Sequence, residues 1–156
     1  EPIVAFSKHT SRPHHHPSFT HLRKHDIVQI DVGARYCGYC ADQSAVFFVG
    51  EPTRLQRQVY DAVAEAKRVA MAAVRAGVTN HELDRIARST LRRHKLERYF
   101  VHALGHGVGL EIHEGPSLSK RAPKMTLLPG EIITIEPGVY IPGKFGIRLE
   151  EEVIVR

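Results

Sequence analysis

Short apolar segments in the first third of the chain predict β-strands. Residues 3–6 (IVAF) form an apolar run, and residues 27–32 (IVQIDV) and 39–49 have the same character. β-branched and aromatic residues are enriched in these segments, as is typical of strands. A turn is predicted over residues 33–38, so the second and third strands are expected to form a β-hairpin.

Two further strands are predicted near the C-terminus. Residues 131–140 (EIITIEPGVY) are predicted to form one strand and residues 147–155 (IRLEEEVIV) the last one, with a turn at residues 143–146 between them. A basic loop that contains prolines is predicted over residues 117–130.

The central part of the chain has helical periodicity. Each of two segments opens with a capping box, in which Thr53 precedes Gln56 and Thr79 precedes Glu82. The first helix is expected to end at Gly77, because glycine is a typical stop signal. The apolar positions recur at helical spacing: Leu55, Val59, Val63, Ala66, Ala70 and Val74, then Leu83, Ile86, Ala87 and Leu91.

Mostly antiparallel strands with helices on one face predict an α+β fold. A length of 156 residues and a hydrophobic content of 42% are sufficient for one globular domain, taken as residues 1–156. Apolar runs stay well short of the ~20 residues that cross a bilayer, and no leader is recognisable, so neither a membrane location nor secretion is expected. A chain that begins EPIVAF without methionine is interpreted as part of a longer protein.

The formal net charge is +5, and much of it lies on the second predicted helix. Arg85, Arg88 and Arg92 share one helix face, but no aromatic residues are interleaved with them, so nucleic-acid binding is not expected. A solvated basic face is the interpretation adopted. His81 and His94 fall at polar positions of the same region and are likewise expected to be solvated.

Two cysteines, Cys37 and Cys40, lie in the sequence CGYC between strand-like segments. Two cysteines alone do not make a structural zinc site, and a thioredoxin-like pair would be expected to open a helix. Free thiols in a reducing compartment are therefore predicted, which favours the cytoplasm.

Three histidines and three glycines meet in residues 102–113 (HALGHGVGLEIH). Imidazole is the commonest metal-binding and proton-transferring side chain near neutral pH, and glycine lets the backbone approach a ligand closely. Glycine costs about 1 kcal/mol relative to alanine inside a helix. The stretch is interpreted as a strand or loop that lines a site; a glycine-rich hairpin with incidental histidines is the alternative.

A second histidine cluster, His14-His15-His16, lies between prolines in a predicted loop over residues 7–26. Neighbouring side chains on an extended chain point in opposite directions, so only one of the three is expected to have a role. An expression tag would normally be longer and terminal.

Acidic residues on the predicted strands are further candidates. Asp31 and Asp42 can meet on one face of the predicted hairpin, although either alone is explained as a turn cap. A buried acid is costly unless it is paired or binds a metal. Four carboxylates and one imidazole are expected to face inward: Asp31, Asp42, His106, Glu136 and Glu150. Such an oxygen-rich set suits two divalent cations, manganese, cobalt or zinc, better than a lone structural zinc.

These residues and their spacing resemble the metallopeptidase family with the pita-bread fold, which includes methionine aminopeptidase, aminopeptidase P and X-Pro dipeptidase (prolidase). The resemblance runs over essentially the whole chain, through the segments EPIVAF, PHHHP, DVG…GYCAD, HALGHGVGLEIHEGP and TIEPGVYIPGKFGIRLEE. It implies a curved antiparallel sheet with helices on its outer face. The last two carboxylates lie in a setting similar to the X-Pro-cleaving branch rather than to methionine aminopeptidase.

The resemblance implies that the five inward residues are metal ligands. Asp42 and Glu150 would bridge two cations, Asp31 would bind one of them, and His106 with Glu136 the other. Glu136 would also move the proton of a hydroxide that the two cations share. Manganese is the expected metal, with cobalt or zinc as alternatives.

Four more residues match substrate-binding or catalytic positions of the X-Pro-cleaving branch. His14, His102 and His113 would contact the substrate and the tetrahedral intermediate, and Arg148 would be a fixed cation beside them. The implied substrate is a peptide with proline in the second position, cleaved before the proline by an X-Pro dipeptidase or aminopeptidase. A cytoplasmic location is expected, and family members are often homodimers.

The chain also departs from the family pattern. Ser7-Lys8-His9 replaces a common G-x-N turn, and Ser44-Ala45-Val46 replaces a Thr-Arg-Thr-like run. Family members carry two helices before the EPIVAF-like strand, and usually an N-terminal domain. Residues 1–156 are therefore expected to be a C-terminal catalytic domain, truncated at its N-terminus, with one apolar face of the sheet uncovered.

Three other functions are weighed against the X-Pro-cleaving hydrolase. A non-catalytic pita-bread binding module would be expected to lack metal ligands, as would a metal-free creatinase-like hydrolase, yet this chain keeps all five candidates. A methionine aminopeptidase would be expected to carry its last glutamate in a different setting.

Overall fold

The computed structural model describes residues 2–156. Its elements follow in the order β1 (Ile3–Phe6), 3-10 helix η1 (Ser7–Ser11), β2 (Ile27–Tyr36), β3 (Tyr39–Phe48), α1 (Arg54–Ala72), α2 (Asn80–Arg93), 3-10 helix η2 (Glu97–Tyr99), β4 (Ile132–Ile135), β5 (Gly138–Ile141), β6 (Phe145–Arg148) and β7 (Glu151–Ile154). The described strands pair antiparallel, in a sheet of order β1-β2-β3 and in the pairs β4-β7 and β5-β6. The predicted α+β class is confirmed.

The β2-β3 hairpin is longer than predicted. Instead of a turn over residues 33–38, the strands stay paired to Tyr36 and Tyr39, and the turn consists of Cys37 and Gly38. Both turn residues have positive φ, 50° and 88°. A two-residue turn of this kind matches the right-handed twist of the flanking strands, so pairing continues to the tip.

Both predicted C-terminal strands are broken in the middle, which corrects the sequence prediction. Residues 131–140 divide into β4 and β5 at Glu136 and Pro137, and residues 147–155 divide into β6 and β7 near Glu150. The Glu136 amide donates to Leu104 O (2.8 Å) and the Glu150 amide donates to Ser44 O (3.1 Å). Pro137 has no amide hydrogen. The two backbones therefore leave their ladder and bond to other parts of the chain.

Both predicted capping boxes are present. Thr53 Oγ1 accepts from the Gln56 amide, Thr79 Oγ1 accepts from the Glu82 amide, and each glutamine or glutamate side chain accepts a hydrogen bond from the corresponding threonine amide. The first helix, however, ends at Ala72 rather than at Gly77.

The early end of α1 has a tertiary cause. The Ala76 amide donates to Arg156 O (2.7 Å) and the Gly77 amide donates to Leu127 O (3.0 Å). These bonds to distant segments replace the helical bonds that the Ala76 and Gly77 amides would otherwise make.

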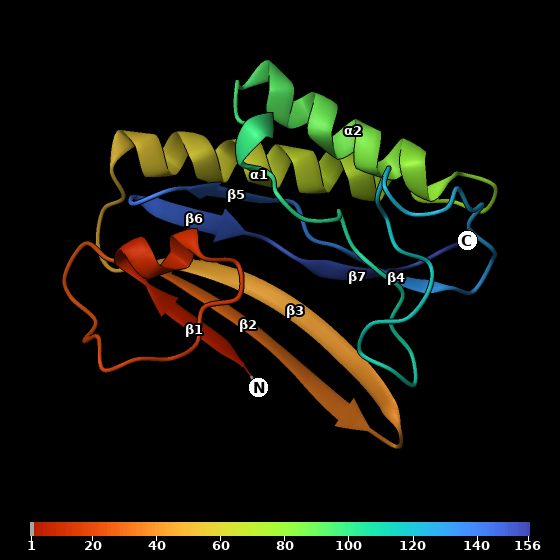
Figure 1. Ribbon diagram of the computed structural model, residues 1–156, viewed down its shortest axis with the longest axis horizontal. Coiled ribbons are helices and arrows are strands. Elements are labelled where there is room, and N and C mark those ends of the chain that lie inside the picture. Colours follow the sequence, from red (N-terminus) through yellow and green to blue (C-terminus); the bar gives the residue numbers. More distant parts are fainter. Residues whose placement is uncertain (1) are drawn as a thin grey trace.

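The helices and the C-terminal strands enclose the main core. In Figure 1, α1 and α2 lie together on one side of the strands, with β5 and β6 beneath α1 and the curved β1-β2-β3 sheet on the far side. The core side chains come from both helices and from the C-terminal strands: Val59, Val63, Leu83, Leu91, Ile133, Ile135 and Ile147. Burial of each such side chain contributes about 1.5–3 kcal/mol.

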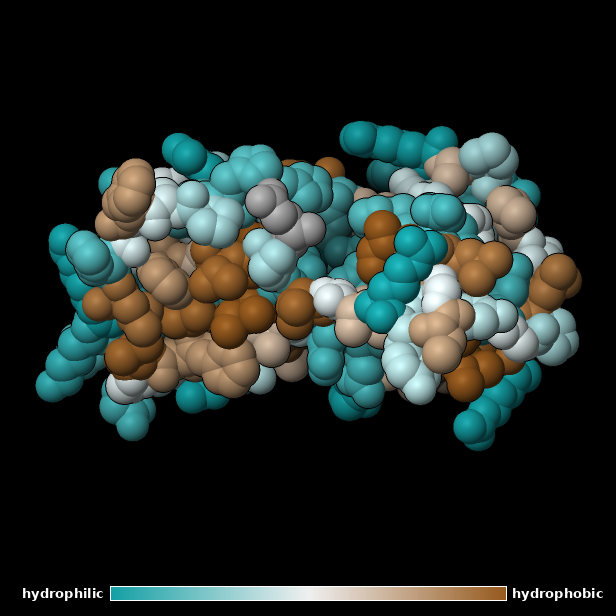
Figure 2. Space-filling view, turned by 90° about the horizontal axis from the view of Figure 1, so that it is seen from below, coloured by the Kyte–Doolittle hydropathy of each residue, from teal (hydrophilic) through white to brown (hydrophobic). Residues whose placement is uncertain are grey.

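The face of the β1-β2-β3 sheet that points away from the helices is apolar and open. Figure 2 views the molecule from this side and shows hydrophobic side chains gathered over the sheet. Val32 on β2 is 49% exposed and Phe47 on β3 is 55% exposed. An uncovered apolar sheet face is therefore present, as expected from the sequence.

The predicted solvated face of α2 is only partly correct. Arg85 and Arg92 are exposed, but the side chain of Arg88 is only 15% exposed and is paired with Asp84. His94 is exposed and contacts Glu65, whereas His81 is half-buried and its ring bonds to a backbone carbonyl oxygen (2.8 Å). Contacts with Asp84 and Phe100 for Arg88, and with the Ala122 carbonyl for His81, therefore hold two side chains that polarity alone would place in solvent. No helix within residues 2–156 is long and apolar enough to cross a membrane.

Candidate metal centre

The β2-β3 hairpin brings the two candidate aspartates onto one face. Asp31 pairs with Ser44 and Asp42 pairs with Gly33, so the aspartates are diagonal neighbours across the hairpin. Diagonal residues on one face of an antiparallel pair lie within reach of each other. Burial, together with repulsion from Asp31, raises the pKa of Asp42. The hairpin thus supplies two carboxylates whose mutual repulsion requires a cation or a proton.

The strand breaks supply the other two carboxylates. Glu136 lies between β4 and β5, and Glu150 lies between β6 and β7. At both positions the backbone amide bonds to a segment outside these strands, so neither glutamate is part of a strand ladder. Ser44 Oγ donates to Glu150 Oε2 (2.8 Å). Burial, with repulsion from Asp42, raises the pKa of Glu150 to about 7, and burial with repulsion from Glu150 raises that of Glu136.

His106 comes from a loop that is tied to β4. Its amide donates to Thr134 Oγ1 (3.1 Å), and its carbonyl oxygen accepts from the Thr134 amide (2.8 Å). This close approach requires glycine at the preceding position, because a Cβ on Gly105 would lie 2.0 Å from Thr134 O. The predicted strand or loop is thus a loop, and its glycines serve backbone contact.

The ring of His106 is oriented for a ligand. Nδ1 lies 3.0 Å from the carbonyl oxygen of Gly107, which can only accept, so Nδ1 carries the proton. The bare Nε2 faces Glu136 Oε1 at 3.6 Å and Asp42 Oδ2 at 3.8 Å. Burial lowers the pKa of His106, which keeps the ring neutral. A ring nitrogen held in this way by a backbone carbonyl is typical of metal-binding histidines.

The geometry and chemistry of the donor set fit divalent cations. Three groups of side chains place their ligand atoms within 4.8 Å of one another: Asp31, Asp42 and Glu150; His106, Glu136 and Glu150; Asp42, His106 and His113. The carboxylate oxygens and the unprotonated imidazole nitrogen are electron-pair donors, which repel one another unless a cation or a proton lies between them. Glu150 belongs to the first two groups and Asp42 to the first and third, and such shared ligands suit two adjacent cations.

A hydrogen-bonded chain extends from this centre to His102. Arg148 donates to the Tyr140 hydroxyl (2.7 Å), which lies 2.9 Å from His102 Nε2. His102 Nδ1 lies 2.7 Å from Ala103 O, so the proton is on Nδ1 and Tyr140 donates to Nε2. Burial lowers the pKa of His102 to about 4 and raises that of Tyr140 to about 12. Both groups are neutral near pH 7.

Arg148 is almost fully enclosed, with 4% of its side chain exposed. It donates to Ser44 Oγ (3.0 Å) and Pro13 O (3.2 Å), and it forms an ion pair with Asp31. Burial alone would lower its pKa, but Tyr140 and Asp31 raise it. Arg148 therefore ties the loop that carries His14 to β2, β3 and β5.

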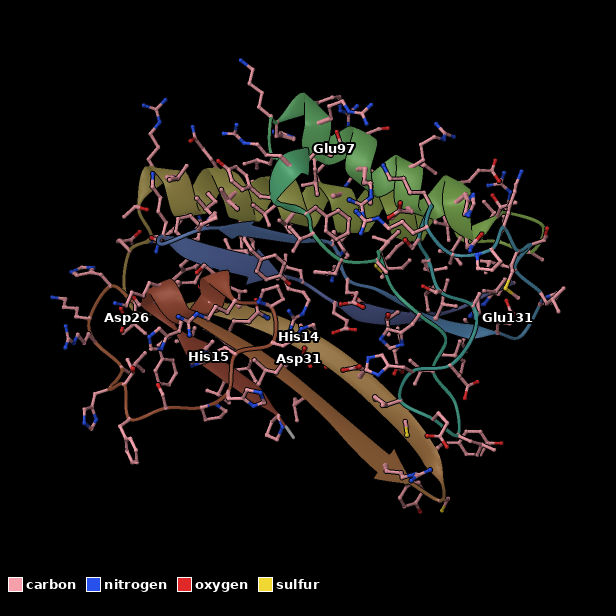
Figure 3. The ribbon with its side chains drawn as sticks, in the orientation of Figure 1. His14, His15, Asp26, Asp31, Glu97 and Glu131 are labelled. Carbon is pink, nitrogen blue, oxygen red and sulfur yellow. The ribbon has the colours of Figure 1, made fainter. Side chains whose placement is uncertain are left out.

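All nine predicted site residues line one cleft of about 780 Å³. His14 and His113 are exposed at its surface, and the ring of His113 lies 4.2 Å from that of His106. His14 lies near Asp31 in Figure 3, whereas the labelled acids Asp26, Glu97 and Glu131 lie at the periphery. His15 is buried against His9, with ring centroids 4.6 Å apart. Of the adjacent histidines, His14 thus faces the cleft, and His15 does not line it.

Sequence reasoning missed several groups that support the site. Tyr140 lies in an ordinary apolar strand pattern that gives no signal of a site, and Ser44 stands out in the sequence only as a departure from the family pattern. Asp84 and Arg88 were missed as well, although Asp84 follows the core residue Leu83 directly. A charge beside a core position with an opposite charge four residues later is the signal that could have identified this pair.

Comparison with known proteins agrees with this geometry. The family model "Metallopeptidase family M24" matches residues 1–156. An Xaa-Pro dipeptidase of Pyrococcus furiosus is 42% identical over 153 residues, which cover 98% of this chain and 44% of that protein. The chain spans less than half the length of the curated relatives it matches.

Solved structures of prolidases and X-Pro aminopeptidases superimpose closely on this chain. A recombinant prolidase from Thermococcus sibiricus superimposes with a TM-score of 0.97 at 40% identity, covering 100% of this chain and 42% of that one. An X-Pro aminopeptidase from Thermotoga maritima gives a TM-score of 0.95 at 42% identity, covering 99% and 44%. These similarities confirm the pita-bread class expected from the sequence. The chain belongs to metallopeptidase family M24.

Proposed function

We propose that this chain carries the catalytic centre of a metal-dependent exopeptidase that hydrolyses the peptide bond before proline. The observation that carries the proposal is the overlap of the ligand groups, in which Asp42 and Glu150 each belong to two sets. Relatives named as X-Pro dipeptidases and aminopeptidases support this substrate class. Dipeptides and longer peptides with proline in second position are therefore both candidate substrates.

The five candidate ligands divide into two overlapping sets. Asp31, Asp42 and Glu150 would hold one cation, while His106 and Glu136 would share Glu150 and Asp42 with it to hold the other. Two divalent cations held there would polarise the scissile carbonyl and lower the pKa of water, which would supply a nucleophile near neutral pH. Manganese is the metal proposed, with cobalt or zinc as alternatives.

Glu136 is proposed to move the proton. Its Oε1 faces His106 Nε2 (3.6 Å), whereas its Oε2 is turned toward His102 Nδ1 (3.9 Å). Oε1 is thus committed to the ligand set, and Oε2 is the atom that can take a proton from the attacking water and deliver it to the departing nitrogen. In the metal-free site, burial and repulsion from Glu150 raise the pKa of Glu136, and a carboxyl group positioned beside the reacting atoms can serve as general base and then as general acid.

The cleft histidines are proposed to bind the substrate. His14 and His113 are exposed at the cleft surface and can donate to a substrate carbonyl or carboxylate oxygen. His102 is proposed to contact the tetrahedral intermediate on the side that faces Glu136. The Tyr140 hydroxyl holds the His102 ring in one tautomer. Arg148 contributes a fixed positive charge beneath them, through contacts that already engage Asp31 and Tyr140.

A homodimer and a cytoplasmic location also belong to this proposal. Cys37 and Cys40 are free thiols in the structure, which is compatible with a reducing compartment. Sedimentation of the intact protein tests the dimer.

The experiment is hydrolysis of an X-Pro dipeptide and of a longer X-Pro peptide by the intact protein with manganese, before and after addition of a chelator. Cleavage that the chelator abolishes is expected. His106→Ala should remove both metal binding and cleavage, and His94→Ala, which changes an exposed histidine far from the centre, is the matched control. Activity that survives chelation would overturn the proposal.

Failure to bind manganese would instead favour the non-catalytic binding module. Release of N-terminal methionine in preference to a residue before proline would favour a methionine aminopeptidase.

A further inference from the structure

The strongest feature outside the metal centre is a buried ion pair on α2. Asp84 is fully buried, and Arg88 Nε donates to both of its carboxylate oxygens, at 3.0 and 2.9 Å. A buried ion pair is weak evidence for stability, because desolvation offsets most of the attraction. The two other nitrogens of the Arg88 guanidinium, NH1 and NH2, bind backbone carbonyls near the cleft, and these contacts indicate a role for the pair.

Arg88 binds the start of the loop formed by residues 102–113, called the histidine-glycine loop below. Its NH1 donates to Phe100 O (2.9 Å) and its NH2 donates to His102 O (2.7 Å). The guanidinium also lies over the Phe100 ring, 4.3 Å from its centroid, and that ring meets His102 edge-on at 5.1 Å. The planar fork of arginine holds two carbonyls at once, which the single ammonium of lysine cannot reproduce.

Asp84 also binds the loop that follows Ser117, a residue that lines the cleft. Its Oδ2 accepts from the Lys120 amide (3.3 Å), in the loop that follows Ser117. That loop also pairs with the histidine-glycine loop, because the Leu104 amide donates to Leu118 O (2.8 Å). One side-chain pair therefore fixes two loops that border the cleft.

His102 is consequently fixed through both its backbone and its ring. Its backbone carbonyl is bound by Arg88, and its ring is bound by Ala103 O and by the Tyr140 hydroxyl. Without Arg88, only the ring contacts would fix the side chain, and Asp84 would be left as an uncompensated buried charge.

We propose that Asp84 and Arg88 are positioning residues, which act from helix α2 through the His102 carbonyl to hold the His102 ring against Glu136. This inference deepens the proposed function and rests on it, since the ring is assigned a role in hydrolysis there. Neither residue touches the substrate.

The primary variant is Arg88→Lys, which keeps a positive charge beside Asp84 but loses the double carbonyl contact. Arg92→Lys is the matched control, one turn further along the same helix, where the arginine is exposed and pairs with Glu97. For cleavage of an X-Pro peptide by the intact protein with manganese, Arg88→Lys is expected to lower kcat about 10- to 100-fold. KM and manganese affinity should stay near wild type, and Arg92→Lys should match wild type.

A double-mutant cycle separates positioning from a general structural role. In a His102→Ala background, Arg88→Lys should cause little further loss of kcat, because its effect is transmitted through the missing ring. The same fold-loss in both backgrounds would overturn the proposal. If Arg88→Lys does not fold, Asp84→Asn, which leaves Arg88 able to bind the carbonyls but removes its charge partner, should show the same non-additivity with a smaller loss.

A measurement independent of activity distinguishes this proposal from the proposed function. In the metal-free protein, NMR of the His102 imidazole should report a neutral ring with its proton on Nδ1, and Arg88→Lys should shift these signals while Arg92→Lys leaves them in place. A wild-type protein that cleaves no X-Pro peptide would refute the proposed function, and the NMR result would then decide the positioning proposal. Unchanged His102 signals in Arg88→Lys would refute the positioning proposal.

Discussion

Replacement of Gly105 by alanine should loosen the candidate metal centre without removing any ligand. A Cβ at this position would lie 2.0 Å from Thr134 O, 2.7 Å from Thr134 C and 2.8 Å from Thr134 Oγ1. Ordinary contact begins at 3.4 Å, so the loop and β4 must separate by about 1.4 Å. The obstructing atoms include rigid strand backbone, which cannot rotate away as a flexible side chain would.

This separation of the loop from β4 would move the next residue, His106. Its amide and its carbonyl oxygen both bond to Thr134, and metal sites tolerate ligand shifts of only about 0.2 Å. We expect Gly105→Ala to weaken manganese binding by at least tenfold and to destabilise the fold by about 1–3 kcal/mol through overpacking.

Isothermal titration with manganese and thermal unfolding of the metal-free protein measure these two effects. Gly115→Ala is the matched control, because a Cβ on Gly115, in the same loop region, meets no atom within 4 Å. The control should bind manganese like wild type. Wild-type affinity and stability in Gly105→Ala would show that close backbone approach does not constrain His106.

Three further outcomes are expected. Burial and repulsion from Asp42 raise the pKa of Glu150 from 4.5 to about 7; the contribution of this protonated carboxyl group to the stability of the metal-free protein is therefore complete below pH 4.5 and is lost as the pH rises through 7. Melting temperatures with a chelator should show this fall, manganese should suppress it, and a flat profile with chelator would contradict the assignment. Ser44→Ala removes the hydroxyl that donates to Glu150 (2.8 Å), so chemical denaturation should show a loss of about 1–3 kcal/mol, and unchanged stability would argue against this bond. Thr79→Ala removes the cap that accepts from the Glu82 amide (3.2 Å) and should cost about 1 kcal/mol, while X-Pro cleavage stays at the wild-type rate.

The sequence predicted those parts of the site that depend on local pattern. Asp31 and Asp42 were placed on one face because a hairpin has a period of two residues, and a change in turn length from six residues to two still kept them diagonal. The helix starts were also predicted, because a capping box is complete within four residues.

The parts that depend on distant partners could not be predicted in the same way. Residues 131–140 look like one continuous strand, and the break is explained by Pro137, which lacks an amide hydrogen, together with the distant bond from the Glu136 amide to Leu104 O. The exposure of Arg88 was misjudged for the same reason, since its carbonyl acceptors lie 12 and 14 residues further along the chain.

The separation of the site residues along the chain has a consequence for folding kinetics. Ser44 and Glu150 are 106 residues apart, yet they share a hydrogen bond at the centre of the site. The β2-β3 hairpin can form early from local contacts, but a pairing across so many residues must first meet the entropic cost of closing a long loop. The chain therefore acquires its helices and hairpins before it acquires a site, and cation affinity should rise only in the last phase of refolding. Stopped-flow refolding with a manganese-sensitive signal would place that phase after the recovery of helical circular dichroism.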